Sequence, residues 1–433
     1  MPLFNPHKPD LDEFDDETRR IFEATIDFFE GKGKEWLLQQ DRDRVWYDEF
    51  LRRRAHRSGV GGGARHRRRL RDEPVNDREE QAMRKTREIT PHEDYGFFGP
   101  DSITQKVWGH PSVPLMGIVR AVTIEELDPH LLAAVHNTGA NYDRLDTRYA
   151  RTVQYFAAVA FADSRTVAKM ADVLVKIHSK AIGIEPVSGN RYDANDPDSQ
   201  LWILITGWHS VLTAYETFGP GRLSDAEVEQ FWGECAIAAE FQTCDPRAVP
   251  RTREEVRAYF EEWRPRLAAS EATQQMMHHL LNGTNAILPG KGLLGLARPI
   301  ANALICRATI ATLPRHMRRL ADIRQSRVTD VVVIAIMRAM MAPAHRSRAL
   351  QRWILGILAP KALPIMEPVW RGIPPVHPVV LTPAEARERY GYVKPAQAHL
   401  ELRARQRARV FDDRQAPSDE GLIESQPILG TLG

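Results

Sequence analysis

Cysteine, net charge and long apolar runs are all scarce in this sequence. Its 433 residues include three cysteines, Cys235, Cys244 and Cys306, whose number and spacing fit neither a zinc site nor a disulfide framework. The formal net charge of +2 is too small to imply a polyanionic partner such as a specific nucleic acid. The sequence therefore favours a reduced compartment and excludes disulfide-rich and strongly basic classes of protein.

Signals for export or membrane insertion are also missing. The first 16 residues are rich in acids and prolines and lack the basic start of a secretory signal. No stretch reaches the roughly 20 consecutive apolar residues of a bilayer-crossing helix. The nearest two, Val328–Met341 and Trp353–Met366, contain charged residues or prolines, so we expect buried helices or surface-docking segments there. We expect a cytoplasmic protein with, at most, peripheral membrane contact.

Several catalytic signatures do not occur, and strand signals are nearly absent. There is no glycine-rich phosphate loop, no Gly-x-Ser-x-Gly elbow and no His-Glu-x-x-His helix. Helix start and stop signals are frequent instead. Asp196 and Pro197 begin a helix over Leu201–Phe218, and Gly219 ends it. The pairs Ser224 with Glu227 and Thr252 with Glu255 have capping-box spacing. We predict an all-α, multi-helix globular fold.

Composition divides the chain into four parts. Residues 1–71 form a helical appendage that ends in the basic Arg/Gly segment 52–71, residues 95–313 the main helical domain, residues 314–404 a helical extension packed on it, and residues 405–433 an exposed tail. The segment 52–71 has no acid and three consecutive glycines. It is either a solvated tether or a patch that binds an anionic membrane or a nucleic acid.

The most informative single residue is His178. Val167, Ala171, Leu174 and His178 follow the three-and-four spacing of one apolar helix face, so the imidazole should point inward. An inward imidazole needs a partner. Either a carbonyl, hydroxyl or carboxylate accepts its hydrogen bond, or it binds a metal, of which haem iron is the most plausible.

Two helices carry polar stripes on apolar bodies. Within Leu201–Phe218 the stripe includes Thr206 and His209, and it should line a cavity or meet another polar helix. Within Thr147–Phe161 it includes Arg148, Arg151 and Thr152. The planar arginine fork suits carboxylates, either haem propionates or local acids such as Asp143 and Asp146.

Taken in order, these motifs resemble one family over roughly Tyr95 to Leu313. The family comprises bacterial and fungal oxygenases, among them latex-clearing protein, which is a rubber oxygenase, and the MpaB-type enzymes. The matching segments are Gly96-Phe97-Phe98-Gly99-Pro100-Asp101-Ser102, Arg120 to Pro129, Arg148-x-x-Arg151-Thr152, Ile177-His178, Tyr192-x-Ala194-x-Asp196-Pro197, Leu201-Trp202, Phe218-Gly219, Leu223-Ser224 and Pro250-Arg251-Thr252. The chain differs at Asp128 and Leu204, where many relatives have histidine, and at Arg151, where the rubber oxygenases have lysine.

The resemblance implies an all-α fold with a globin-like core around haem b, in which His178 is the proximal iron ligand. Arg148, Arg151 and Thr206 would then bind the cofactor, and Arg151, Thr152 and His209 would serve catalysis. We therefore expect a haem b-dependent oxygenase that uses O₂ on an apolar, isoprenoid-like or lipid-like substrate. The alternative is a non-catalytic helical haem-binding or membrane-peripheral protein.

Overall fold

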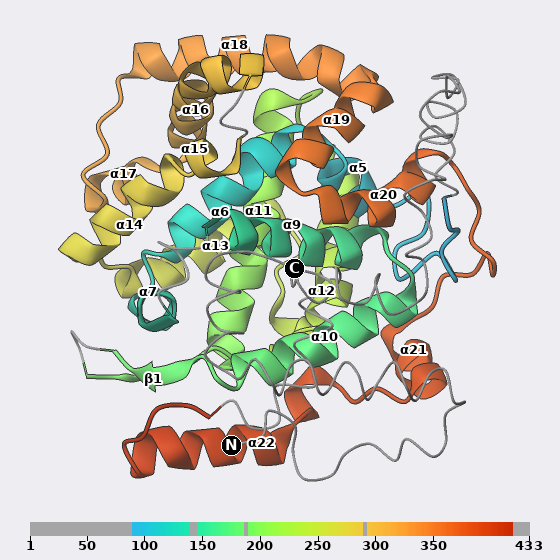
Figure 1. Cartoon of the computed structure of the whole chain (residues 1–433), viewed down its shortest axis with the longest axis vertical. Coiled ribbons are helices and arrows are strands. Elements are labelled where there is room, and N and C mark those ends of the chain that lie inside the picture. The colour runs from blue at the N-terminus through green and yellow to red at the C-terminus, as the bar shows by residue number, and fades with distance from the viewer. Residues whose placement is uncertain (1–88, 139–144, 186–188, 289–291, 419–433) are drawn as a thin grey trace, which may run out of the picture. The chain divides into compact units, whose positions relative to one another are not determined.

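The computed structural model describes residues 89–138, 145–185, 189–288 and 292–418. The expected appendage and basic segment within residues 1–71 lie outside this part of the chain. The described part is almost wholly helical, which confirms the all-α prediction (Figure 1). The one sheet found there pairs β1 (Ile182–Ile184) with β2 (Arg191–Asp193) in antiparallel register, Gly183 opposite Tyr192.

The helices follow one another with short connections. In the first half they are α5 (Ile103–Trp108), α6 (Ile118–Glu125), α7 (Pro129–Thr138), α9 (Leu145–Phe161), α10 (Ser164–His178), α11 (Pro197–Phe218) and α12 (Asp225–Ala239). The second half contains α13 (Arg253–Trp263), α14 (Glu271–Leu281), α15 (Thr284–Ile287), α16 (Gly292–Thr312), α17 (Arg315–Leu320), α18 (Arg327–Arg346), α19 (Arg348–Leu358), α20 (Leu363–Trp370), α21 (Pro383–Tyr390) and α22 (Leu400–Arg407).

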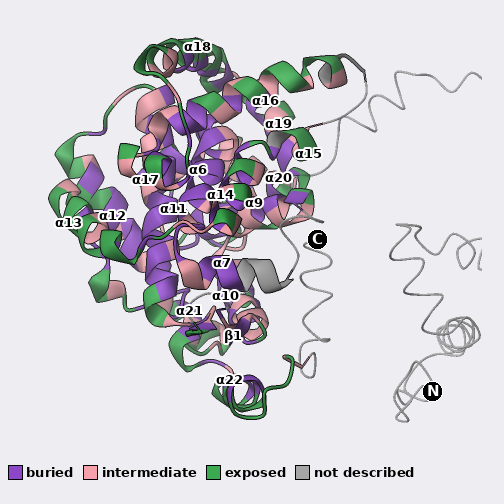
Figure 2. Cartoon of the chain, turned by 90° about the vertical axis from the view of Figure 1, so that its left-hand side faces the viewer, coloured by how far each residue is buried: buried purple, intermediate pink, exposed green. Residues whose placement is uncertain are grey.

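Helix α11 lies at the centre of the helical body (Figures 1 and 2). The Asp196 side chain accepts a hydrogen bond from the Ser199 backbone, Pro197 occupies the first turn, and the helix stops before Gly219, as the sequence predicts. Its apolar side chains point in all directions, and Trp202, Ile205 and Val211 are completely buried. A helix that is apolar over most of its circumference is expected to be buried, and this one lies in the core.

The segment that precedes α5 is fixed by local geometry around Gly96. This glycine has φ +68°, and a Cβ built on it would lie 2.3 Å from the Ala162 carbonyl oxygen. Its backbone N–H donates to Asp94, which also accepts from the Ser164 backbone at the start of α10. Only glycine fits there, because the backbone must be left-handed and must approach α9 closely. These constraints explain why the motif from Gly96 to Ser102 begins with a glycine.

The helices after Leu313 share the main core instead of covering it. Met317, Leu355 and Met366 belong to the same buried cluster as α11 and α9. The exposed tail that we expected from residue 405 begins later in the chain, because α22 continues to Arg407 and a π-turn follows at Ala408–Asp412. Val410 and Phe411 are buried against β1, which holds this end of the chain to the helical body.

Candidate functional site

His178 is the last residue of α10. The helix begins at Asp163, whose side chain accepts a hydrogen bond from the Thr166 backbone. Val167 and Ala171 on the same face are buried, and His178 itself is half-buried. The predicted face is buried at Val167 and Ala171 and half-buried at Leu174 and His178, and it places the imidazole at the C-terminal end of α10, beside the first turns of α11.

The surroundings of His178 keep its imidazole neutral. Burial lowers its pKa to about 4; Asp193 opposes the shift and Arg148 adds to it. The Gln200 side-chain nitrogen lies 3.4 Å from the histidine Nδ1 and also donates to the Ala194 carbonyl at 2.6 Å. The other ring nitrogen, Nε2, forms no hydrogen bond with any described residue. An Nδ1 that accepts from the Gln200 nitrogen leaves the proton of the neutral ring on Nε2, so metal binding through Nε2 needs that proton on Nδ1 and the Gln200 amide oxygen turned toward it.

Arg148 lies beside this imidazole, on the first turn of α9. Burial lowers its pKa, while the carboxyl groups of Glu126 and Glu125 act in the opposite direction. Within the described residues, no hydrogen bond or ion pair within 4 Å joins its guanidinium to another side chain. An enclosed guanidinium with unused donors is suited to bind a carboxylate supplied by a ligand.

No pattern in the sequence pointed to Glu125, the last residue of α6. Burial raises its pKa to about 8; Glu126 contributes in the same direction and Arg148 opposes it. The carboxyl group therefore holds a proton at neutral pH. It belongs to the site through its electrostatic interaction with Arg148 of α9, a relation between two elements that no local pattern encodes.

The protonation of Glu125 can be tested through stability. The unfolded chain loses this proton near pH 4.5, whereas the folded chain keeps it up to about pH 8. Its contribution to the free energy of unfolding is therefore fully present below 4.5 and is lost as the pH rises through about 8. Urea unfolding should give Glu125→Gln a shallower decline across this window than the wild type. Glu229→Gln, on the exposed face of α12, should follow the wild type, and an equal decline in Glu125→Gln would contradict the assignment.

The arginine stripe of α9 is assembled as expected. Arg148, Arg151 and Thr152 are three and four residues apart and share one helix face. Arg151 is exposed and Thr152 half-buried. The three residues therefore form one row along α9. Arg148 is the member of this row that lies next to His178.

The structure does not bring Thr206 and His209 to this cluster. Nine residues separate Gln200 from His209, which turns the helix by about 900° and puts the two side chains on opposite sides of α11. His209 lines a separate cavity of about 420 Å³. Its Nδ1 lies 3.4 Å from Nη1 of the buried Arg120, and burial, with Arg120 and Arg253, lowers its pKa.

Thr206 is completely buried, and its hydroxyl has no partner among the described residues. It precedes by four residues Ser210, which accepts a hydrogen bond from Arg120 of α6. Thr206 therefore faces α6, away from His178. The polar stripe that the sequence predicts exists, but it serves the packing of α11 against α6.

Comparison with known proteins identifies one family. The model of the catalytic domain of the ER-bound oxygenase mpaB/B′ and rubber oxygenase matches residues 105–346, more than half of the chain. The match includes the whole His178 cluster and extends beyond Leu313 to the end of α18. No curated protein and no solved structure matches the chain.

Proposed function

The chain belongs to the mpaB/rubber oxygenase catalytic domain family, and we propose that it is a haem b-dependent oxygenase that acts on an apolar substrate. The observation that carries the cofactor is the pair of unused groups at one place: the neutral His178 ring with a free Nε2 and the enclosed Arg148 guanidinium. Haem can bind both groups, because its iron binds a neutral imidazole and its propionates pair with an arginine.

The side chains around His178 are better suited to bind haem than a bare metal ion. In the described part of the chain no group of three or more His, Cys, Asp or Glu side chains is arranged to hold a metal ion. A metal bound there through His178 must therefore bring its other ligands with it, as iron in a porphyrin does.

Each residue of the cluster has a chemical task in this proposal. Bound haem supplies the binding and activation of O₂. His178 would hold the iron through Nε2, and the Gln200 amide, turned so that its oxygen accepts from Nδ1–H, would orient the ring. Arg148 binds a propionate, and Arg151 and Thr152 extend the same face. Glu125 holds a proton at its carboxyl group at neutral pH and lies within the electrostatic reach of Arg148. It is therefore the acid available to move a proton in this site.

The apolar substrate is inferred from the family. The rubber oxygenases are named for a hydrocarbon polymer, and an isoprenoid-like or lipid-like molecule is the corresponding class here. Recognition of such a molecule needs burial of apolar area more than specific polar contacts.

A visible spectrum tests the proposal. The full-length chain is titrated with haem, reduced, and exposed to CO. We expect a strong Soret band that shifts with CO, because an oxygenase needs an open position on the iron. A band that CO leaves unchanged would favour a closed, non-catalytic haem protein. Absence of a Soret band would contradict the proposal that the chain binds haem.

The role of Arg148 predicts a charge-dependent retention of haem. Arg148→Leu should weaken retention by about 2 kcal/mol, roughly 30-fold, because a charge-assisted hydrogen bond is lost. Arg148→Lys should lose less. Transfer of haem to apomyoglobin measures the rates, and Arg257→Leu on the exposed face of α13 is the control. Equal rates of haem transfer from Arg148→Leu and Arg148→Lys would contradict the proposed contact between Arg148 and a propionate.

A further inference from the structure

Helix α18 exposes a row of large apolar side chains at the edge of the molecule. Val328 and Val331 are 74% and 69% exposed. The row continues on α16, which packs against α18, with Leu296 and Ile300 at 77% and 67%. We call this surface the apolar ridge, and its members are Val328, Val331, Val332, Ile336, Met340, Leu296 and Ile300. Both views place α18 at the same outer end of the helical body (Figures 1 and 2).

The exposure of this ridge is not the result of a poorly packed helix. The opposite face of α18 buries Val333, Met337 and Met341, which pack with Phe218 and Ile305. α18 is thus apolar on both sides, and by length and composition it could cross a membrane. The packing of its inner face holds α18 along the protein surface instead. Its outer face is therefore the one that a membrane or another molecule would contact.

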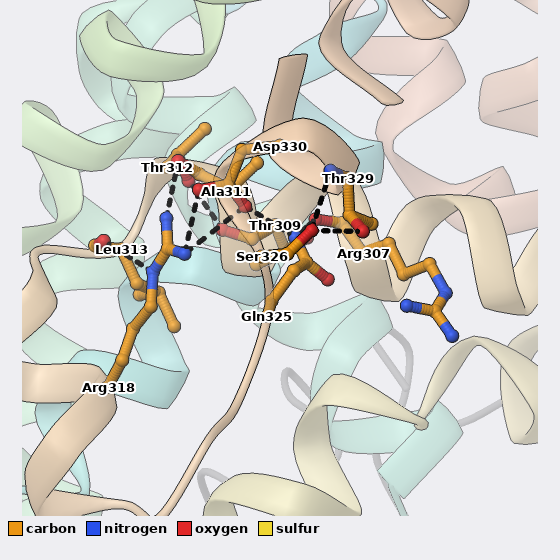
Figure 3. Close-up of polar contacts among 10 residues, drawn as sticks. All are labelled: Arg307, Thr309, Ala311, Thr312, Leu313, Arg318, Gln325, Ser326, Thr329 and Asp330. Carbon is orange, nitrogen blue, oxygen red and sulfur yellow. Dashed lines mark hydrogen bonds and ion pairs between the residues drawn. The ribbon is translucent and has the colours of Figure 1, made fainter. Parts of the chain in front are cut away.

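A polar junction fixes the first turn of α18 (Figure 3). The Arg318 side chain donates to the carbonyls of Leu313 and Ala311, at 2.9 and 2.8 Å, and pairs with Asp330 at 2.9 Å. Gln325 donates to the same Asp330 at 2.7 Å and to the Arg307 carbonyl at 2.9 Å. These contacts tie the linker and the helix to α16 and α17. They leave the ridge rigid and outward-facing.

The charge around the ridge is strongly one-sided. Residues 292–346 contain nine arginines, two aspartates and neither lysine nor glutamate, a net charge of +7. Both aspartates already pair with arginine, Asp330 with Arg318 and Asp322 with Arg324. The remaining arginines include Arg327, Arg338 and Arg346 on α18 itself. Arginine stems lie along apolar surface and keep their charged heads at its border.

We infer that the apolar ridge docks on an anionic lipid membrane, with α18 lying parallel to the bilayer surface. Exposed apolar side chains enter the boundary between headgroups and acyl chains, and the surrounding arginines contact anionic headgroups. The charge argues against a second copy of this chain, because two copies of the segment 292–346, each with a net charge of +7, would repel each other. A helix at the outer edge of the body is also better placed to lie on a flat membrane than to enter the groove of a partner protein.

Vesicle binding by the full-length chain tests the inference. Phosphatidylcholine vesicles with and without phosphatidylserine are pelleted with the wild type and with Val332→Gln/Ile336→Gln. We expect binding to the anionic vesicles that partly persists in high salt, because the apolar contacts are not screened. The double variant should bind about tenfold more weakly, since two apolar side chains no longer enter the lipid. Both positions are exposed, so the fold should be retained, and circular dichroism checks this.

The matched control changes the same residue chemistry elsewhere. Val376 and Val393 are also exposed, at 63% and 54%, and lie outside the ridge. Val376→Gln/Val393→Gln should bind like the wild type. Equal binding of the two double variants, or no binding of the wild type, would overturn the inference. So would a dimer, seen by light scattering, that Val332→Gln/Ile336→Gln dissociates. The readout needs no haem, so its failure is separate from that of the proposed oxygenase activity.

Discussion

Replacing His178 with alanine should abolish haem binding and leave the helical content unchanged. Burial keeps the His178 ring neutral, and its Nε2 forms no hydrogen bond with a described residue. Without it the iron loses its protein ligand, and Arg148 alone cannot hold the cofactor. Haem titration followed at the Soret band measures the loss, and far-ultraviolet circular dichroism checks the fold.

A control and a rescue make this result specific. His278→Ala, at an exposed position on α14, should bind haem as the wild type does. Added imidazole should restore a Soret band in His178→Ala, because it can occupy the space that the side chain leaves. Haem bound at wild-type stoichiometry with an unchanged spectrum in His178→Ala would eliminate His178 as the iron ligand.

The sequence predicted well those features that depend on neighbours in the chain. Ser224 and Glu227 form the expected capping box, and Asp128 accepts hydrogen bonds from the His130 and Leu131 backbones at the start of α7. Caps and first-turn prolines act within one helical turn, so their residues are visible in any window of the sequence. For the same reason the inward face of α10, which carries His178, was predictable.

The partners of His178 were not predictable in the same way. Gln200, and Glu125 beside Arg148, come from different helices and are brought there only by packing, while Arg148 was expected near His178 only through the family resemblance. His209 shows the opposite case. Because apolar residues cover most of the circumference of α11, the pattern did not reveal which side faces His178, and the structure puts His209 on the other side.

Helix α18 was ambiguous for a related reason. An apolar run of this length is equally consistent with a buried helix and with a docking surface. The structure resolves the two faces: Val333, Met337 and Met341 are buried, while Val328, Val331 and their neighbours are exposed. Arg338 and the pairing of Asp330 with Arg318 decide which side turns inward, and that pairing spans 12 residues across a linker.

Asp330→Ala should destabilise the folded chain by about 3 kcal/mol, because it leaves the nearly buried Arg318 without its counter-charge. Gln325 loses an acceptor in the same step. Urea unfolding measures the change in the free energy of unfolding, and Asp330→Asn, which keeps the acceptor oxygen, should lose less. Asp322→Ala is the matched control: its ion pair with Arg324 is 3.3 Å long but exposed, so its removal should cost about 0.5 kcal/mol or less. Equal costs for the two alanine variants would mean that the junction in Figure 3 does not hold α18 in place, and that the ridge it presents is free to move.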